Sequence, residues 1–263
     1  MSRTYFTADR VRELERRLAD RDWTVLKSVG RLRLVTGEQL GRLHFTDTTL
    51  RQRRRALARL VDLRLLAVLD RRIGGVRAGS DGLVYTLDVA GIRLMEVGAQ
   101  RRVQRPTTPS LLYLRHALKV SELYVQLSEV QRKRGFDLLD FEAEPACWRS
   151  FAGRGGGRGM LKPDAYVRIA TEAFEDSWFV EVDLATESPR ALDRKLAVYR
   201  QYWQSGREQA ACGVFPRVLW LVPDERRHAV VADACARQPT EVWPLFLVTL
   251  VSDAAGLMTG AAA

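Results

Sequence analysis

Residues 36–61 read TGEQLGRLHFTDTTLRQRRRALARLV, and this stretch decides the fold of the first third of the chain. Thr36 stands three residues before Gln39, which predicts a capping box at the start of a short helix. A longer helix follows, with a cap at residue 46, 47 or 48 and an arginine-rich exposed face. The arginines of that face are Arg51, Arg53, Arg54, Arg55 and Arg59. With an amphipathic segment over 23–34, the pattern predicts three helices in a row, as in a helix-turn-helix.

A β-hairpin is predicted after the third helix. Residues 65–69 and 83–87 are apolar and strand-like, and a glycine-rich loop over 74–82 separates them. Such a hairpin is the wing of a winged helix, and Arg71, Arg72 and Arg77 stand on it or near its tip, where they can meet DNA phosphates. We therefore predict a helical arm over 1–21 and a winged-helix DNA-binding domain over 22–98.

The excess positive charge of the chain lies in its first part. The net charge is +10; residues 1–105 hold 23 Lys/Arg and 12 Asp/Glu, whereas residues 106–263 hold 19 and 20. Lys and Arg that neutralise phosphates release condensed counterions, so a basic segment favours a polyanion partner. The competing interpretation is a solvated arginine-rich surface. We expect double-stranded DNA as the partner.

Several classes of protein are excluded by composition. No apolar run approaches the ~18 residues of a membrane span, and the N-terminus lacks an apolar signal core, so we expect a cytoplasmic protein with no membrane partner. Cys147, Cys212 and Cys235 are far apart and form no CxxC pair. This spacing predicts reduced, packed thiols rather than disulfides or a zinc site.

A second domain is predicted beyond a linker at 99–110, over residues 111–252, with a tail at 253–263. Helical periodicity covers 111–134, 188–203 and 226–237, and strands are indicated at 136–143, 165–169, 178–184, 218–222 and 245–251. This order predicts an α/β sandwich with at least one parallel crossover. The fold class is therefore α/β, or α+β when both domains are considered.

Acidic residues stand at the ends of the predicted strands. Glu181 and Asp183 are spaced i, i+2 and project from the same face, while Asp164 opens the preceding strand. Buried acids are costly unless they are paired or bind a metal. Mg²⁺ or Mn²⁺ held by these carboxylates and by phosphate oxygens would offset that cost and activate water.

These residues resemble a known arrangement. Lys162-Pro163-Asp164, then Glu181-Val182-Asp183, then a helix with Lys195 and Tyr199, is similar to the PD-(D/E)XK nucleases. The layout over about residues 22–250 resembles the replication-relaxation family of plasmid proteins, including His116 and Glu122 on the first helix of the second domain. The resemblance implies DNA binding in plasmid replication, relaxation or mobilisation, with plasmid replication or conjugation proteins as partners. It also implies Asp164, Glu181 and Asp183 as metal ligands and Glu122 as an accessory acid.

The chain departs from the nuclease pattern at one position. Lysine usually stands two residues after the second acid, and Asp183 occupies that position here. Lys195 on the following helix is the candidate replacement; alternatively, it is a surface residue balanced by Glu187 or Asp193. Glu122 alternatively occupies an ordinary solvated helix position.

Three functions therefore remain open. The first is a DNA-binding protein that nicks or relaxes plasmid DNA with a divalent metal. The second is a non-catalytic relaxosome accessory protein or transcription regulator whose nuclease fold has lost its chemistry, which Asp183 favours. The third combines a protein-binding winged helix with a small-molecule enzyme.

Overall fold

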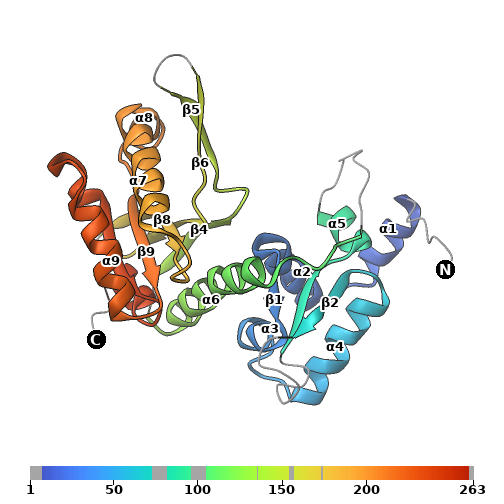
Figure 1. Ribbon diagram of the computed structural model, residues 1–263. Helices are drawn as coiled ribbons and strands as arrows, with labels where there is room; N and C mark the ends of the chain where they lie inside the picture. The colour runs from blue at the N-terminus through green and yellow to red at the C-terminus, as the bar shows by residue number, and fades with distance from the viewer. Residues whose placement is uncertain are drawn as a thin grey trace. The chain divides into compact units, whose positions relative to one another are not determined.

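The computed structural model describes residues 8–72, 82–95, 105–134, 136–153, 157–172 and 174–260 (Figure 1). Helices and strands are mixed along the chain, in agreement with the predicted α/β class. Contacts divide the chain into two compact units, Met1–Val125 and Gln126–Ala263. Each unit is described separately below.

Unit 1 contains helices and a small antiparallel sheet. In chain order its elements are α1 (Ala8–Arg16), α2 (Asp20–Leu32), β1 (Val35–Thr36), α3 (Gly37–His44), α4 (Leu50–Asp62), β2 (Leu66–Arg72), β3 (Leu83–Leu87), α5 (Val89–Met95) and the first half of α6 (Leu111–Arg134). The strands lie in the order β1-β3-β2. The three predicted helices and both hairpin strands are present. Apart from Gly82, the predicted loop over 74–82 lies outside the described residues.

Helix caps explain where α3 and α4 begin. Gln39 N donates to Thr36 Oγ1 at 3.1 Å and Thr36 N donates to Gln39 Oε1 at 3.0 Å, which confirms the predicted capping box. Helix α4 is capped by Thr49, so the prediction of residue 46, 47 or 48 was wrong. Thr49 is favoured because Gln52 stands three residues later and completes a second capping box.

The division between the units falls inside α6, at Val125, rather than at the predicted linker 99–110. Leu114, Ala117 and Leu118 of α6 are buried in a cluster with three apolar residues of unit 1. Those three are Leu34, Leu69 and Val84. Apolar burial therefore joins the first half of the helix to unit 1. Residues 105–110 have no regular secondary structure, and 99–104 lie outside the described residues.

Unit 2 is built on a five-stranded sheet in the order β10-β9-β8-β7-β4. Its elements after α6 are β4 (Asp137–Ala143), β5 (Arg149–Ala152), β6 (Arg158–Leu161), β7 (Ala165–Ala170), β8 (Glu175–Val182), α7 (Pro189–Gln204), α8 (Arg207–Cys212), β9 (Arg217–Val222), α9 (Glu225–Ala236), the 3₁₀ helix η2 (Thr240–Leu245), β10 (Phe246–Leu250) and α10 (Ala254–Met258). Strands β8, β9 and β10 are parallel, which confirms the predicted parallel crossover. The hairpin β5–β6 was not predicted as strands.

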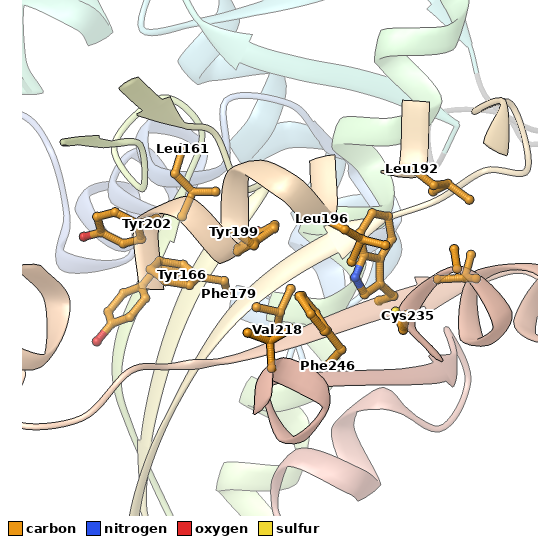
Figure 2. Packing of buried hydrophobic residues seen from close by; sticks show 14 of the residues in the cluster. Leu161, Tyr166, Phe179, Leu192, Leu196, Tyr199, Tyr202, Val218, Cys235 and Phe246 are labelled. Carbon is orange, nitrogen blue, oxygen red and sulfur yellow. The ribbon is translucent and has the colours of Figure 1, made fainter. Parts of the chain in front are cut away.

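Side-chain alternation along β8 positions the polar residues of unit 2. Phe179 faces α7, and its ring centroid lies 6.1 Å from that of Tyr199 on this helix and 5.6 Å from that of Tyr166 on β7 (Figure 2). Glu181 follows two residues later and points to the same side of the sheet. The sheet therefore carries Glu181 beneath α7, at the edge of the apolar cluster.

Three smaller findings bear on the predictions. The predicted tail at 253–263 contains α10, because Ala254, Ala255 and Met258 are buried. All three cysteines are free; Cys147 and Cys235 are buried, whereas Cys212 is exposed, so the prediction that it is packed was wrong. Within the described residues, no helix combines the length and the apolar character needed to cross a bilayer.

Candidate functional site

The first candidate site is the exposed face of α4. Leu57 and Leu60 are buried in the interior of unit 1, so the opposite side of the helix faces outward. Arg51, Arg54 and Arg55 on that side are exposed. Their spacing of three and four residues places them on one face of the helix. Unit 1 therefore presents a row of guanidinium groups.

Two other arginines of α4 have partners within unit 1. Arg59 forms an ion pair with the buried Asp22 of α2. Arg53 is half-buried and lies so close to Gly41 of α3 that a Cβ at that glycine would overlap its guanidinium group. Of the five arginines grouped by the sequence, Arg53 and Arg59 thus contact neighbouring helices of unit 1, although Arg59 is also partly exposed.

The predicted hairpin arginines are only partly described. Arg71 and Arg72 are the last two residues of β2. Arg77 lies outside the described residues.

The second candidate site is a cluster of carboxylates at the end of β8. Asp164 N donates to Val180 O at 3.0 Å, and Asp164 Oδ2 accepts from Val182 N at 2.7 Å. Because Tyr166 pairs with Phe179 in the ladder, alternation places Asp164 opposite Glu181 on the same face. The two carboxylates therefore stand side by side on neighbouring strands.

Glu181 is fully buried, and α7 supplies both of its hydrogen-bond donors. Tyr199 Oη donates to Oε1 at 2.5 Å and Lys195 Nζ donates to Oε2 at 2.9 Å. Lys195 and Tyr199 are four residues apart, so one helix face delivers both groups. Ser188 caps this helix and Pro189 occupies its first turn, which fixes its start close to β8.

Lys195 joins Glu181 to a further acid. Its Nζ also donates to Glu187 Oε1 at 3.0 Å and lies 5.2 Å from the ring centroid of Trp220. Asp193, the other acid considered as a partner, pairs instead with Arg237. The ammonium group of Lys195 is thus shared between two carboxylates.

Burial and neighbouring charges shift the pKa values of this cluster. Burial raises the pKa of Glu181 to about 8, and Asp164 adds to the rise, while Lys195 and Tyr199 oppose it. Burial acts to lower the pKa of Lys195, but Glu181, Asp164 and Glu187 together raise it above its ordinary value. Burial and the Glu181 carboxylate raise the pKa of Tyr199.

Asp183 has a different neighbour. Arg227 of α9 donates to Asp183 Oδ2 from Nε at 3.0 Å and from Nη2 at 2.5 Å, while Asp183 Oδ1 accepts from Ala185 N at 2.6 Å. Arg227 Nη2 also donates to Glu187 O at 2.9 Å. Arg227 therefore ties together both ends of the segment that joins β8 to α7. Nothing in the sequence pattern pointed to Arg227, because it stands 44 residues from Asp183.

Glu122 lies in unit 1, not with the carboxylates of unit 2. Its Oε1 accepts from Arg42 Nη1 at 2.6 Å and its Oε2 accepts from Gln39 Nε2 at 3.0 Å. These contacts join the first half of α6 to α3. The acid at position 122 is therefore explained by its contacts within unit 1.

Comparison with known proteins identifies the family of the chain. The family described as Replication-relaxation matches residues 26–218, which is more than half of the chain. The chain belongs to the replication-relaxation family. Membership indicates a role in the replication or relaxation of plasmids or other mobile elements. No curated protein and no solved structure matches the chain.

The three expected metal ligands of this replication-relaxation protein do not lie together, because Asp183 is paired with Arg227. Within the described part of the chain, no three His, Cys, Asp or Glu residues are grouped so that they could hold a metal ion. The Asp183 carboxylate is already paired with the Arg227 guanidinium group. Asp164 and Glu181 remain as the two neighbouring carboxylates. Mg²⁺ is commonly held by one or two carboxylates together with substrate phosphates.

The raised pKa of Glu181 predicts a pH-dependent stability for the replication-relaxation protein. An unfolded glutamate titrates near 4.5 and the folded Glu181 near 8, so the folded state retains a proton that the unfolded state has lost between these values. The free energy of unfolding should fall as pH rises through this window, by on the order of a few kcal/mol. Lys195 also has a raised pKa, and its contribution is lost only at higher pH.

Urea unfolding at a series of pH values measures this slope. Glu181→Gln should remove the decrease, because glutamine does not titrate. Glu175→Gln, at the exposed start of β8, is the matched control and should keep it. An identical decrease in the Glu181→Gln variant would contradict the assignment.

Proposed function

We propose that the chain binds double-stranded DNA through the exposed face of α4, as a protein of plasmid or mobile-element replication, relaxation or mobilisation. The observation that carries the proposal is the row formed by Arg51, Arg54 and Arg55 on a helix whose opposite side is buried. Guanidinium groups bind phosphates and read guanine in the major groove, where a helix fits.

The element order of unit 1 supports the same interpretation. Helices α2, α3 and α4 are followed by the β2–β3 hairpin, and β1 completes the small sheet in the order β1-β3-β2. This is the order expected of a winged helix, in which the third helix enters the groove and the hairpin lies beside it. In this proposal plasmid replication or conjugation proteins are the protein partners.

Binding of the full chain to duplex DNA tests this function. The association constant should fall steeply as salt concentration rises, because phosphate contacts release counterions. A variant without the three exposed arginines of α4 should bind more weakly and with a shallower salt dependence. Binding that is independent of salt would contradict the proposal.

We propose a second candidate function, metal-dependent nicking of DNA by unit 2 as a PD-(D/E)XK-like domain. One observation favours it: Lys195 lies 2.9 Å from Glu181, next to Asp164, although it comes from a helix rather than from the strand. Asp164 and Glu181 would hold Mg²⁺ or Mn²⁺, which supplies Lewis-acid chemistry when bound. Lys195 would balance the charge of the two acids and place a proton donor beside the reacting phosphate, while Asp183 and Arg227 hold the adjacent segment.

Nicking of supercoiled plasmid separates this candidate from a non-catalytic accessory protein or regulator. The full chain with Mg²⁺ or Mn²⁺ should produce open circles, and Asp164→Asn or Lys195→Ala should reduce the rate by at least ~100-fold. Glu175→Gln should nick as the wild type does, and a chelator should stop the reaction. Intact supercoils with full DNA binding would instead support the non-catalytic function.

A further inference from the structure

The hairpin of β5 and β6 stands apart from the five-stranded sheet of unit 2 (Figure 1). Its strands pair only with each other among the described residues, with Arg149 opposite Leu161 and Ala152 opposite Arg158. An isolated two-stranded hairpin is marginally stable in water. Something at its base must therefore hold it in place.

The base is held by burial and by one arginine. Phe151 and Leu161 are buried in the main apolar cluster of unit 2. The Arg149 guanidinium donates to Glu142 Oε2 at 3.1 Å and lies 5.0 Å from the Tyr166 ring centroid. Gly159 leaves room for the Phe151 ring, whose nearest atom would be 2.6 Å from a Cβ at that position. The hairpin is thus anchored on its inner face.

The outer face of β6 is basic. Alternation places Arg158 and Met160 on one side of the strand, opposite to Leu161. Lys162, the first residue after the strand, continues this side, and all three residues are exposed. Neither cation pairs with a carboxylate of the described residues, and Lys162 Nζ lies 4.6 Å from the Trp148 ring centroid. The sequence from Arg149 to Pro163 contains no acid.

The outer face of β6 is close in sequence to the carboxylate cluster. Strand β6 ends at Leu161, and Lys162 and Pro163 connect it to Asp164. Asp164, Glu181 and Glu187 surround one lysine, so their combined charge repels phosphates unless other cations lie close by. In an extended chain, Arg158 and Lys162 are ~13 Å apart, which is far enough for the two side chains to contact separate phosphates.

We propose that the outer face of β6 is a second DNA-binding surface, on which Arg158 and Lys162 contact the phosphate backbone and hold it beside Asp164. The inference rests on the proposed DNA-binding function and extends it from unit 1 to unit 2. Gly157 agrees with it: a Cβ there would meet no neighbouring atom, so packing does not demand glycine, whereas a bare backbone lets a phosphate approach closely.

The test compares two double variants of the full chain. Arg158→Ala/Lys162→Ala removes the two cations of β6, and Arg207→Ala/Arg226→Ala removes two exposed cations from α8 and α9 as a matched control. Fluorescence anisotropy with a labelled duplex gives the association constant from 50 to about 200 mM salt, a range over which phosphate contacts are resolved. Circular dichroism checks that each variant is folded.

We expect the salt slope of the log association constant to become shallower by about 2 in the β6 variant and to stay unchanged in the control, because each phosphate contact contributes about 0.9. Arg158→Lys/Lys162→Arg, which keeps both charges, should retain the wild-type slope. A slope equal to that of the control would overturn the inference.

The same measurement in the Arg51→Ala/Arg54→Ala/Arg55→Ala background separates the two proposals. Residual binding that disappears when the β6 cations are also removed supports the inference. If the α4 variant binds as the wild type does while the β6 variant is weakened, the role of α4 is refuted and the β6 surface stands. If only the α4 variant is weakened, the β6 surface is refuted and the proposed function stands.

Discussion

Replacing Arg51, Arg54 and Arg55 together with alanine should weaken duplex-DNA binding by about 100-fold at low salt, because each well-placed arginine contributes roughly 1 kcal/mol or more. The three side chains are exposed on one face of α4, and their replacement leaves the buried Leu57 and Leu60 in place. The salt slope should become shallower by about 3. Anisotropy titrations at several salt concentrations measure both changes.

The control removes the same charge from another part of the chain. Arg194, Arg207 and Arg226 are exposed in unit 2, and their joint replacement with alanine should change affinity by no more than about twofold. Arg59→Ala should behave differently again: it leaves the buried Asp22 without its ion-pair partner, so the thermal stability of unit 1 should fall. If the α4 triple variant keeps its affinity, a protein-binding role for unit 1 becomes the better explanation.

Arg227→Ala should destabilise unit 2 by about 3–5 kcal/mol, because it leaves the Asp183 carboxylate buried without a positive partner. The Asp183 side chain is 0% exposed and the Arg227 side chain 10% exposed, so water cannot replace the lost contacts. The segment between β8 and α7 also loses its bond to Glu187 O. The midpoint of urea unfolding measures the loss of stability. Hydrogen exchange of the backbone amides of β8 and β9 shows whether the loss is located in unit 2.

The neighbouring residue is a close control for this prediction. Arg226 is on the same helix but exposed, and Arg226→Ala should change stability by no more than about 0.5 kcal/mol. Asp183→Asn/Arg227→Ala should recover part of the loss, because a neutral amide is less costly to bury than an unpaired carboxylate. Equal stabilities for Arg226→Ala and Arg227→Ala would show that the ion pair contributes little.

The candidate sites were predicted unevenly, and the residues show why. For Lys195, the sequence left open a place beside the acids or a place on the surface. The Lys195 ammonium group donates to Glu181, and Tyr199, four residues later on the same face of α7, donates to the same carboxylate. Asp183 shares the periodicity of Glu181 on β8, so the pattern grouped the two as metal ligands. Their partners come from different helices, α7 and α9, and periodicity along one strand carries no information about these.

The same distinction applies to unit 1. The arginine row of α4 is visible in the sequence because helical spacing is a local property. The sequence does not show that Arg53 and Arg59 of this row contact α3 and α2. Glu122 is a similar case, since Arg42 and Gln39 stand about 80 residues earlier in the chain.

Local patterns were thus sufficient for the longer helices, the capping box of α3, the strands of the five-stranded sheet and the concentration of positive charge in unit 1. Backbone hydrogen bonding and side-chain periodicity act over a few residues, so a short window contains the information. Which charged side chain pairs with which, where α6 passes from one unit to the other, and how β5 and β6 are anchored were decided by tertiary packing. These outcomes depend on burial against residues tens of positions away, where the cost of an unpaired charge selects the partner.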